Sequence, residues 1–340
     1  MDAKTGAFYN HKNGVLVEKL PTGRDKPWLA PLAGYSDLPF RLLCREYGAA
    51  VCETEMISAK GLVYAGRATR DLLATDVLDQ PLVAQLFGAE PEFLRKAVDL
   101  LLKAGFIWFD LNMGCSVRKV MRQGAGAALL ADHDKAIAAA MALLSAAGRG
   151  RVGVKLRLGV QGEQALTPAL CELALRLEDM GAGWLTLHPR TARQGFGGQA
   201  DWDALAGLSV RLSLPLLASG DLLKAEDGLR CLDYTGASGV MYARGAMRDP
   251  TIFSAHRALC RNMCPQQPDA DILYAVILRH VALARAFSPD MRALRKMRSV
   301  IPLYARSLSG VRVLRDAVCR SATWRELEDV LAAFFLTGKS

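Results

Sequence analysis

The 340-residue sequence has no long hydrophobic run, no basic segment followed by an apolar one at its start, and no CxxC motif. Its longest apolar-rich stretch, 136–148, is too short to span a bilayer. We therefore expect no membrane association and no secretory signal, and we predict a cytoplasmic protein. Eight cysteines without paired Cys or His spacing predict reduced thiols and no metal, although Cys260 and Cys264 form an isolated CxxxC that could bind one.

Composition places the sequence among folded globular proteins, with 51% apolar residues, 23% charged residues and a mean hydropathy of +0.13. Its length allows one large barrel or two domains and excludes a small scaffold held by disulfides. No internal repeat or low-complexity tract is present. The net charge is +9, and residues 256–340 hold most of the excess, with 14 Lys and Arg against seven Asp and Glu. This asymmetry indicates a segment that binds a polyanion.

Eight short apolar or β-branched runs alternate with amphipathic segments that end near a glycine. The first run is not followed by GxGxxG, the motif usual in a doubly wound dinucleotide-binding sheet. Eight strand and helix units in roughly 230 residues therefore predict an α/β fold of the TIM (β/α)8 barrel type. The predicted strands are 28–33, 50–56, 82–87, 107–111, 152–156, 184–187, 215–218 and 239–242.

The pattern changes after the eighth run, where residues 264–268 (CPQQP) form a linker before purely helical segments. We therefore predict a smaller C-terminal helical domain after the barrel. The predicted helices are 272–287, 291–307 and 322–335, and the predicted domains are an N-terminal extension at 1–26, a catalytic barrel at 27–260 and a helical domain at 261–340.

Two glycine-containing turns follow the seventh and eighth runs, where TIM barrels commonly bind a phosphate group. The first turn is Ser219-Gly220-Asp221 and the second is Ala243-Arg244-Gly245. Two ordinary strand-to-helix turns are the alternative. The adjacent positions of the turns and the presence of an arginine favour phosphate binding.

Polar side chains interrupt three of the predicted strands or strand ends. Lys155 lies in a Val/Leu run, and because an ammonium facing the outer helices would be costly, we expect it to point into the barrel mouth. Gln85 also lies in an apolar strand, where a hydrogen-bonded core glutamine is the alternative to a ligand contact. His188 ends the sixth run beside Arg190, at the rim where it could hold a cofactor or its phosphate rather than only a structural hydrogen bond.

Cys115 is the candidate proton donor because it follows Gly114 at the mouth of the fourth strand. An ordinary thiol is mostly protonated at neutral pH, so it can deliver a proton, whereas nucleophilic attack requires a thiolate. A small core cysteine is the alternative. The neighbouring Asn112 has an amide suited to the edge of a uracil ring.

These motifs, in this order and spacing, resemble the dihydrouridine synthases, flavin enzymes that reduce uridines in RNA, and most closely their bacterial B-type branch. The resemblance covers about residues 27–320. Two positions depart from the family pattern: Ser116 replaces the usual proline, and Ser219 replaces the usual asparagine. The motifs that carry the resemblance are the PLAGYSDLPFR loop, Gln85, the NMGC segment 112–115, Lys155, His188 with Arg190, the GQADW segment 198–202 and the two late turns.

The resemblance implies an enzyme that reduces the C5=C6 bond of uridines in tRNA, with FMN as cofactor and NADPH as reductant. Hydride would reach C6 while Cys115 protonates C5, and we expect a monomer without bound metal. The implied cofactor-binding residues are Pro31, Leu32, Ala33, Gln85, Lys155, His188, Ser219, Gly220, Asp221, Ala243, Arg244 and Gly245. The implied substrate-binding residues are Asn112, Arg190, Arg295, Lys296 and Arg298.

The basic segment 292–320 contains eight Lys and Arg residues with only Asp316 opposing them, and it also contains Tyr304. A solvated helix face is the usual explanation of such a run, but the missing acids favour contact with a phosphate backbone. Two rival functions remain open at this point. One is an FMN barrel oxidoreductase that acts on a free small molecule, resembling dihydroorotate dehydrogenase, and the other is an RNA-binding protein without catalysis.

Overall fold

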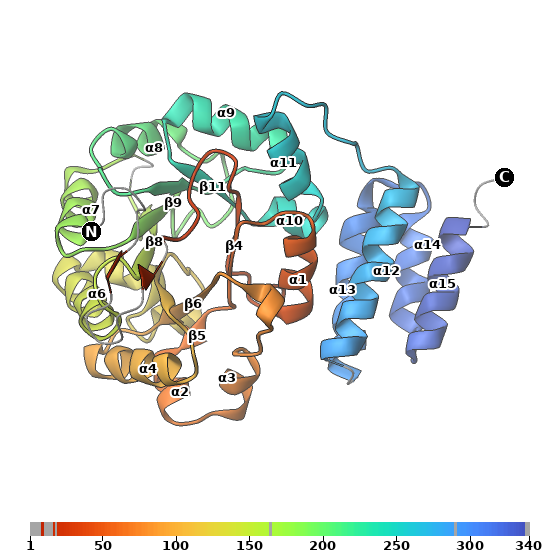
Figure 1. Ribbon diagram of the computed structural model, residues 1–340, viewed down its shortest axis with the longest axis horizontal. Helices are drawn as coiled ribbons and strands as arrows, with labels where there is room; N and C mark the ends of the chain where they lie inside the picture. The colour runs from red at the N-terminus through yellow and green to blue at the C-terminus, as the bar shows by residue number, and fades with distance from the viewer. Residues whose placement is uncertain (1–7, 10–15, 18, 163–164, 289–290, 337–340) are drawn as a thin grey trace.

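Eight parallel strands close into a barrel in the computed structural model, which describes residues 8–9, 16–17, 19–162, 165–288 and 291–336 (Figure 1). Each strand pairs in parallel with the next, and the last pairs with the first. All eight predicted runs overlap a barrel strand, so the predicted fold is confirmed. The barrel strands are β3 (Trp28–Leu29), β4 (Val51–Glu53), β6 (Leu82–Phe87), β7 (Trp108–Met113), β8 (Val152–Gly159), β9 (Trp184–Thr191), β10 (Leu216–Ala218) and β11 (Gly239–Tyr242).

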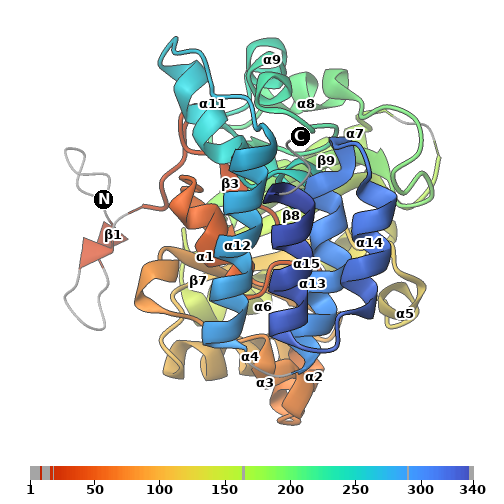
Figure 2. The ribbon, with the colours of Figure 1, turned by 90° about the vertical axis from the view of Figure 1, so that its right-hand side faces the viewer.

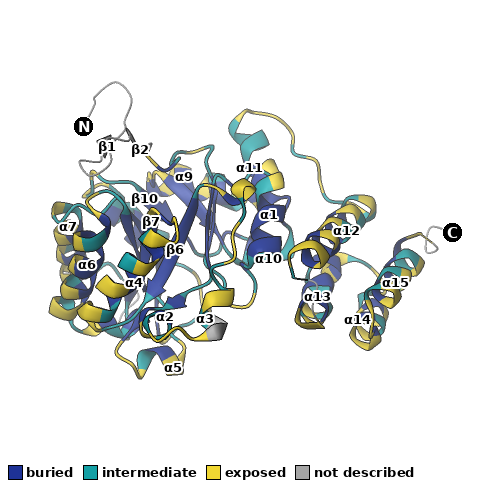
Figure 3. Ribbon diagram, turned by 60° about the horizontal axis from the view of Figure 1, so that its bottom comes forward, coloured by how far each residue is buried: buried dark blue, intermediate teal, exposed yellow. Residues whose placement is uncertain are grey.

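Helices surround the barrel with their apolar faces inward and their exposed residues outward (Figure 3). Asp132 caps one of them by accepting a hydrogen bond from the Lys135 backbone, and Gly148 ends the same helix at φ 94°. The helices around the barrel are α1 (Leu38–Glu46), α2 (Ala59–Val63), α3 (Arg67–Asp71), α4 (Pro91–Lys103), α5 (Arg118–Met121), α6 (His133–Ala147), α7 (Pro168–Asp179), α8 (Trp202–Ser209), α9 (Ala225–Thr235), α10 (Arg244–Arg248) and α11 (Ile252–Cys260).

Several short elements accompany this framework. β5 (Ile57–Ser58) extends from the edge of β6, and β1 (Phe8–Tyr9) pairs with β2 (Leu16–Val17) in a separate ribbon. Residues 1–7, 10–15 and 18 of the predicted extension 1–26 lie outside the described residues. No helix in the described ranges is long and apolar enough to cross a bilayer. The short 3-10 helices are η1 (Val77–Asp79), η2 (Gly126–Ala131) and η3 (Ala305–Ser307).

Three tryptophans fill the lower end of the barrel interior. The rings of Trp28 and Trp108 lie 5.5 and 6.4 Å from the ring of Trp184, in edge-to-face contact. Gly153 faces them without a side chain, because a Cβ at this position would lie 2.0 Å from Trp184 Cε2. This indole floor bounds the barrel interior on the side away from the carboxyl ends of the strands.

Four helices form the C-terminal domain, which a long extended segment joins to the barrel (Figure 1). Three of them match the predicted segments, but the prediction missed the helix that begins after Gly310. That helix buries Leu314 and Val318, which lie four residues apart on one face, so its amphipathic pattern could have predicted it. The domain boundaries remain a prediction. The four helices are α12 (Ala270–Phe287), α13 (Met291–Tyr304), α14 (Val311–Arg320) and α15 (Trp324–Leu336).

The helical domain packs against the barrel domain through two of its helices, α12 against α1 and α13 against α10 (Figure 2). The ring of Phe40 lies 5.7 Å from that of His280, whose Nδ1 is 2.9 Å from the Tyr304 hydroxyl. At the edge of this contact, Lys296 Nζ lies 2.6 Å from an Asp37 carboxylate oxygen and donates to the backbone oxygen of Tyr35. The barrel and the helical domain are therefore joined by both apolar and charged contacts.

Arg41, on α1, forms a fully buried ion pair inside the barrel domain. Its guanidinium donates from Nε and Nη2 to one oxygen of Asp79 at 2.9 and 2.7 Å, and both side chains are at most 1% exposed. It also donates to the backbone oxygens of Ser36 and Ala74. This arrangement fixes α1 against the segment that leads into β6.

Candidate active site

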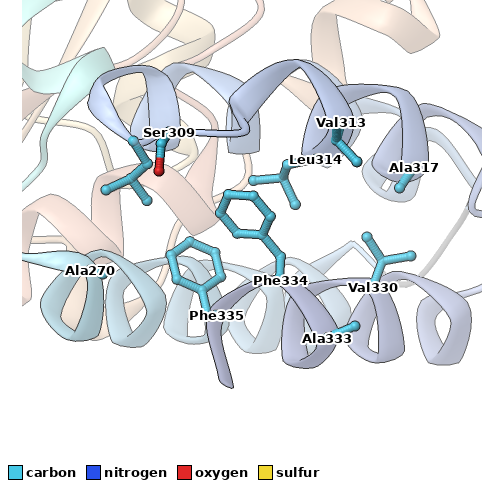
Figure 4. Close-up of a pocket in the computed structure, with 10 residues that line it drawn as sticks. Ala270, Ser309, Val313, Leu314, Ala317, Val330, Ala333, Phe334 and Phe335 are labelled. Carbon is cyan, nitrogen blue, oxygen red and sulfur yellow. The ribbon is translucent and has the colours of Figure 1, made fainter. Parts of the chain in front are cut away.

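Two cavities differ in the chemistry that they offer. One lies in the helical domain, has a volume of about 540 Å³, and is lined by apolar side chains with the Ser309 hydroxyl as its polar group (Figure 4). The other, of about 350 Å³, lies at the carboxyl ends of the barrel strands, and ionisable groups line it. Only the second combines a ligand-sized space with groups that can bind charge or move a proton, as enzyme sites require. We call it the barrel-mouth cavity.

Most of the residues that the sequence predicted as site residues line the barrel-mouth cavity. They come from the loops or ends of seven of the eight barrel strands. Gly245, Arg190, Arg295, Lys296 and Arg298 are not among its lining residues. The predicted residues that line it are Pro31, Leu32, Ala33, Gln85, Asn112, Cys115, Lys155, His188, Ser219, Gly220, Asp221, Ala243 and Arg244.

A chain of amide hydrogen bonds connects Gln85 to the cysteine loop. Asn112 Nδ2 donates to Gln85 Oε1 at 2.8 Å. Asn112 Oδ1 accepts from the backbone N–H groups of Gly114 and Cys115, at 3.1 and 2.8 Å. Asn112 is only 7% exposed, so its amide is largely used in shaping the loop. The carboxamide that we expected to meet a uracil edge thus also positions Cys115.

The Cys115 loop is fixed from its other side by η2. Ala127 N donates to Cys115 O at 3.0 Å. Gly126 permits this approach, since its φ is +62° and a Cβ would lie 2.7 Å from Cys115 O. Cys115 itself is half-buried and free of disulfide bonding. Ser116, the departure from the family pattern, is half-buried beside it.

Two cations extend from β8 into the barrel mouth. Lys155 is half-buried, and burial together with nearby Arg157 lowers the pKa of its ammonium. Arg157 is 5% exposed and donates to the backbone oxygens of Gly114, Thr191 and Gly195. Burial lowers the pKa of Arg157 to about 10. Arg157 was not among the predicted site residues, although its position two residues after Lys155 puts both side chains on the same face of the strand.

His188 is a neutral imidazole under the field of these cations. Burial, reinforced by Lys155 and neighbouring arginines, lowers the pKa of His188 to about 2. Its Nε2 lies 3.2 Å from Arg190 Nη1 and must accept, which leaves Nδ1 to carry the hydrogen. Phe196 stacks on it with ring centroids 6.0 Å apart. Phe196 is 61% exposed and also lines the cavity, and the sequence analysis missed it.

Arg190 has a different position from the one predicted for a substrate contact. It is 1% exposed and donates to both oxygens of Asp221, at 2.9 and 2.7 Å, and to the backbone oxygens of Gly197 and Gly198. Arg244 donates to the same carboxylate at 3.0 Å. Hydrogen bonds and these two guanidinium groups lower the pKa of Asp221 despite its partial burial. Arg190 therefore positions the loop and Asp221 instead of reaching a ligand.

The two late turns lie side by side because β10 pairs with β11. Gly220 has a φ of +116°, and a Cβ there would lie 2.8 Å from the His188 ring, so this position requires glycine. Gly245 is buried, and a Cβ on it would lie 2.6 Å from the backbone oxygen of Leu222. The first turn lines the cavity directly, whereas Gly245 permits close packing behind it.

The three predicted substrate contacts on α13 separate into two groups. Arg295 is exposed. Lys296 is engaged with Asp37 and Tyr35, as described above, and Arg298 donates from Nη2 to the backbone oxygen of Ser321. Internal partners thus engage Lys296 and Arg298, whereas Arg295 is the exposed one of the three, and contact of these residues with RNA stays a prediction.

Among the residues that the structure describes, no three His, Cys, Asp or Glu side chains form a group that could hold a metal ion. Cys260 and Cys264, the isolated CxxxC pair, are both free thiols. Cys260 lies 3.4 Å from the backbone oxygen of Arg24 and Cys264 is exposed.

The family profile described as "Dihydrouridine synthase (Dus)" matches residues 28–337. The chain belongs to this family. Among curated dihydrouridine synthases, it is 31% identical over 313 residues to "Probable tRNA-dihydrouridine synthase 1" of Synechocystis sp., covering 91% of this chain and 86% of that protein. It is 30% identical over 307 residues to "tRNA-dihydrouridine synthase B" of Pseudomonas aeruginosa, covering 86% and 90%. The corresponding protein of Pasteurella multocida is 29% identical over 313 residues, covering 92% and 93%. The expected family is confirmed.

Proposed function

We propose that this dihydrouridine synthase reduces the C5=C6 bond of uridine in tRNA with FMN and NADPH, and that Cys115 is the proton donor. The observation that carries the proposal is the joining of the cysteine loop to the barrel-mouth cavity by Asn112, whose Oδ1 accepts from Cys115 N at 2.8 Å. Since the family acts on RNA, a tRNA substrate also implies a cytoplasmic enzyme.

The donor set of the barrel-mouth cavity fits FMN. At one side, Lys155 offers a cation and Gln85 Oε1 has a lone pair beyond the one that Asn112 uses, which suits the N–H and carbonyl groups of a flavin pyrimidine ring. At the other side, the Gly220 turn and Arg244 offer backbone and guanidinium donors for a phosphate. When bound, FMN supplies the hydride equivalent that originates from NADPH.

Reduction of the uracil ring requires a hydride at C6 and a proton at C5. We assign the proton to Cys115 Sγ, because its loop is held on one side by Asn112 and on the other by Ala127. After the transfer, the thiolate regains a proton from solvent, since Cys115 is only half-buried. Lys155 and Arg157 make the barrel mouth electropositive, which stabilises negative charge that develops on the bound ring during reduction.

A uridine within tRNA must leave its base stack to enter a cavity at the barrel mouth. Phe196 presents an exposed ring at this entrance, and Arg244 lies 4.6 Å from that ring. An aromatic face beside a cation suits an extruded base and its phosphate. The helical domain, which carries the exposed Arg295, would hold the RNA outside the barrel.

The test is a reconstituted reaction with purified protein, FMN, NADPH and tRNA that lacks dihydrouridine. We expect yellow protein and dihydrouridine in the RNA product, detected by nucleoside mass spectrometry. Reduction of a free pyrimidine but not of tRNA would favour the small-molecule oxidoreductase. RNA binding without flavin binding or reduction would favour the non-catalytic alternative.

A further inference from the structure

Two carboxyl groups lie inside the barrel between the indole floor and the barrel-mouth cavity. Glu53 on β4 and Asp110 on β7 are both 0% exposed, as is Gln85 on β6 between them. Two residues earlier on each strand, Val51, Val83 and Trp108 belong to the floor cluster. Alternation along the strands therefore puts the acidic pair directly above the floor. Neither acid lines the cavity, so neither is a direct ligand contact.

The pair is hydrogen-bonded to the active site through Gln85. Gln85 Nε2 donates to Glu53 Oε2 at 3.2 Å and to Asp110 Oδ2 at 2.8 Å. Both hydrogens of this amide therefore point toward the carboxyl groups, and its oxygen faces Asn112. The chain of contacts continues through Asn112 Oδ1 to the backbone of Cys115. The two acids thus fix the orientation of an amide that leads to the cysteine loop.

The charges around the pair do not balance if both acids are ionised. The charge of Lys155 favours the ionised form of both carboxyl groups. Lys155 is in turn influenced by the charge of Arg157 and by Cys115. Two carboxylates and one ammonium would leave a net negative charge in a dry interior, which is costly. Within the described residues, Glu53 Oε1 and Asp110 Oδ1 are buried and have no hydrogen-bond partner. One proton retained by the pair would remove the excess charge.

The surroundings of both acids favour such a shared proton. Burial, and then the charge of Asp110, raises the pKa of Glu53 well above the ordinary range. Burial raises the pKa of Asp110 to about 7, against the opposing effects of Gln85 and Lys155.

We propose that Glu53 and Asp110 share one proton and act as a positioning pair, which holds the Gln85 amide and, through Asn112, the loop of Cys115. The pair and Lys155 together are then neutral. The inference rests on the proposed function only for the catalytic meaning of Cys115. A shared proton also makes the geometry dependent on pH, because loss of that proton puts two carboxylates against one amide.

The first test compares wild type with Glu53→Gln and Asp110→Asn in full-length protein by denaturant unfolding from about pH 6 to about pH 9. The folded-state pKa values are raised, so the stabilisation is present at low pH and is lost as the pH rises through them. In wild type we expect the unfolding equilibrium constant to rise with pH, by up to about tenfold per pH unit. Each amide keeps an oxygen for Gln85 but leaves one acid, so both variants should be flatter than wild type. Equal slopes in all three proteins would overturn the shared proton.

The second test measures the positioning directly, through the rate at which iodoacetamide alkylates Cys115 at one fixed pH, followed by peptide mass spectrometry. Asp110→Ala leaves Gln85 Nε2 with an unpaired hydrogen, whereas Asp110→Asn can still accept it. We expect Asp110→Ala to change the rate by about threefold or more and Asp110→Asn to restore it. Cys264 and Cys319 are exposed thiols in the same molecule and should keep their rates. An unchanged Cys115 rate in Asp110→Ala would overturn the positioning role.

These measurements need neither bound FMN nor RNA reduction. If Cys115→Ala retained full RNA reduction, the proposed role of Cys115 as proton donor would fail, while the pH and alkylation comparisons in wild-type Cys115 protein would still decide the role of the pair. If the amide variants kept the pH dependence of wild type and Asp110→Ala kept its alkylation rate, the pair would be ordinary barrel packing even in an active enzyme.

Discussion

Lys155, Arg157 and Arg190 in the barrel all converge on the barrel mouth, and each is at least half-buried. On the helical domain, Arg295 is exposed, whereas Lys296 turns back toward the barrel. In the barrel, hydrogen bonds fix the cationic side chains in place. On the helical domain, one cationic side chain lies in the contact with the barrel and the other faces solvent. The same substitution should therefore have large effects in the first region and small, salt-dependent effects in the second.

The largest effect is expected at the barrel mouth from Cys115→Ala. Removal of the proton donor should lower the rate of tRNA reduction by about 10²- to 10⁴-fold, since general acid catalysis contributes about that much. FMN binding and NADPH oxidation should remain near wild type, because neither uses the thiol. The measurement is single-turnover formation of dihydrouridine, with flavin absorbance as the control.

A milder change in the same loop is Ser116→Pro, which restores the usual family residue. Proline would stiffen the loop, and activity should be kept if the departure is neutral.

A wild-type rate in Cys115→Ala would show that Cys115 has only a packing role and that another proton donor operates.

The next largest effect is a loss of stability, which should be much greater when a buried ion pair is broken than when an exposed one is broken. Asp79→Ala leaves the 1% exposed Arg41 guanidinium without its carboxylate and should lower the free energy of unfolding by roughly 3–5 kcal/mol. The matched control is Asp71→Ala, which removes the exposed partner of Arg292 across the two domains. That change should cost less than about 1 kcal/mol. Denaturant midpoints measure both, and equal losses would remove the distinction between the regions.

A smaller effect is expected from Lys296→Gln at the domain contact. The variant loses the Asp37 ion pair and weakens the hydrogen bond to Tyr35, which should lower the free energy of unfolding by about 1–2 kcal/mol. Because Lys296 is occupied, the dependence of tRNA affinity on salt should keep its slope. A flatter slope would return Lys296 to the group of phosphate contacts.

The smallest effect is expected from Arg295→Gln, on the exposed face of the same helix. Loss of one phosphate contact should flatten the log-log dependence of tRNA affinity on salt by up to roughly one. Unfolding should be unchanged, since the side chain is exposed. Filter binding over a range of salt concentrations measures the slope, and an unchanged slope would indicate a merely solvated arginine.

The sequence predicted the barrel because strand periodicity and turn residues are local signals. The same kind of signal could have found two further residues. Arg157 lies two residues after Lys155 on β8, and Asp110 lies two residues before Asn112 on β7, so the members of each pair point to the same face of their strand. The missed helix, α14, buries Leu314 and Val318 four residues apart on one face, so the same local pattern could have predicted it as well. Its basic residues had drawn attention to the charge of this segment and away from its periodicity.

The partners of charged residues could not be read from the sequence, because they depend on contacts between distant segments. Lys296 belongs to a run of basic residues, but its ion pair with Asp37 forms only when α13 packs beside the first barrel loop. Arg190 was predicted to contact substrate at the barrel rim, but in the structure it forms an ion pair with Asp221, which follows the next strand. The excess of Lys and Arg over Asp and Glu predicted a basic C-terminal domain, but it did not predict which of these side chains are free to contact RNA.

The contact between Gly153 and Trp184 also constrains how this barrel can change over evolution. A side chain at position 153 would overlap the indole, with its Cβ 2.0 Å from a ring carbon. Replacement of the glycine thus becomes tolerable only after the tryptophan has given way to a smaller residue, and that first step alone would leave a void in the floor. The two positions should therefore covary among homologous sequences, a larger residue at one accompanying a smaller residue at the other.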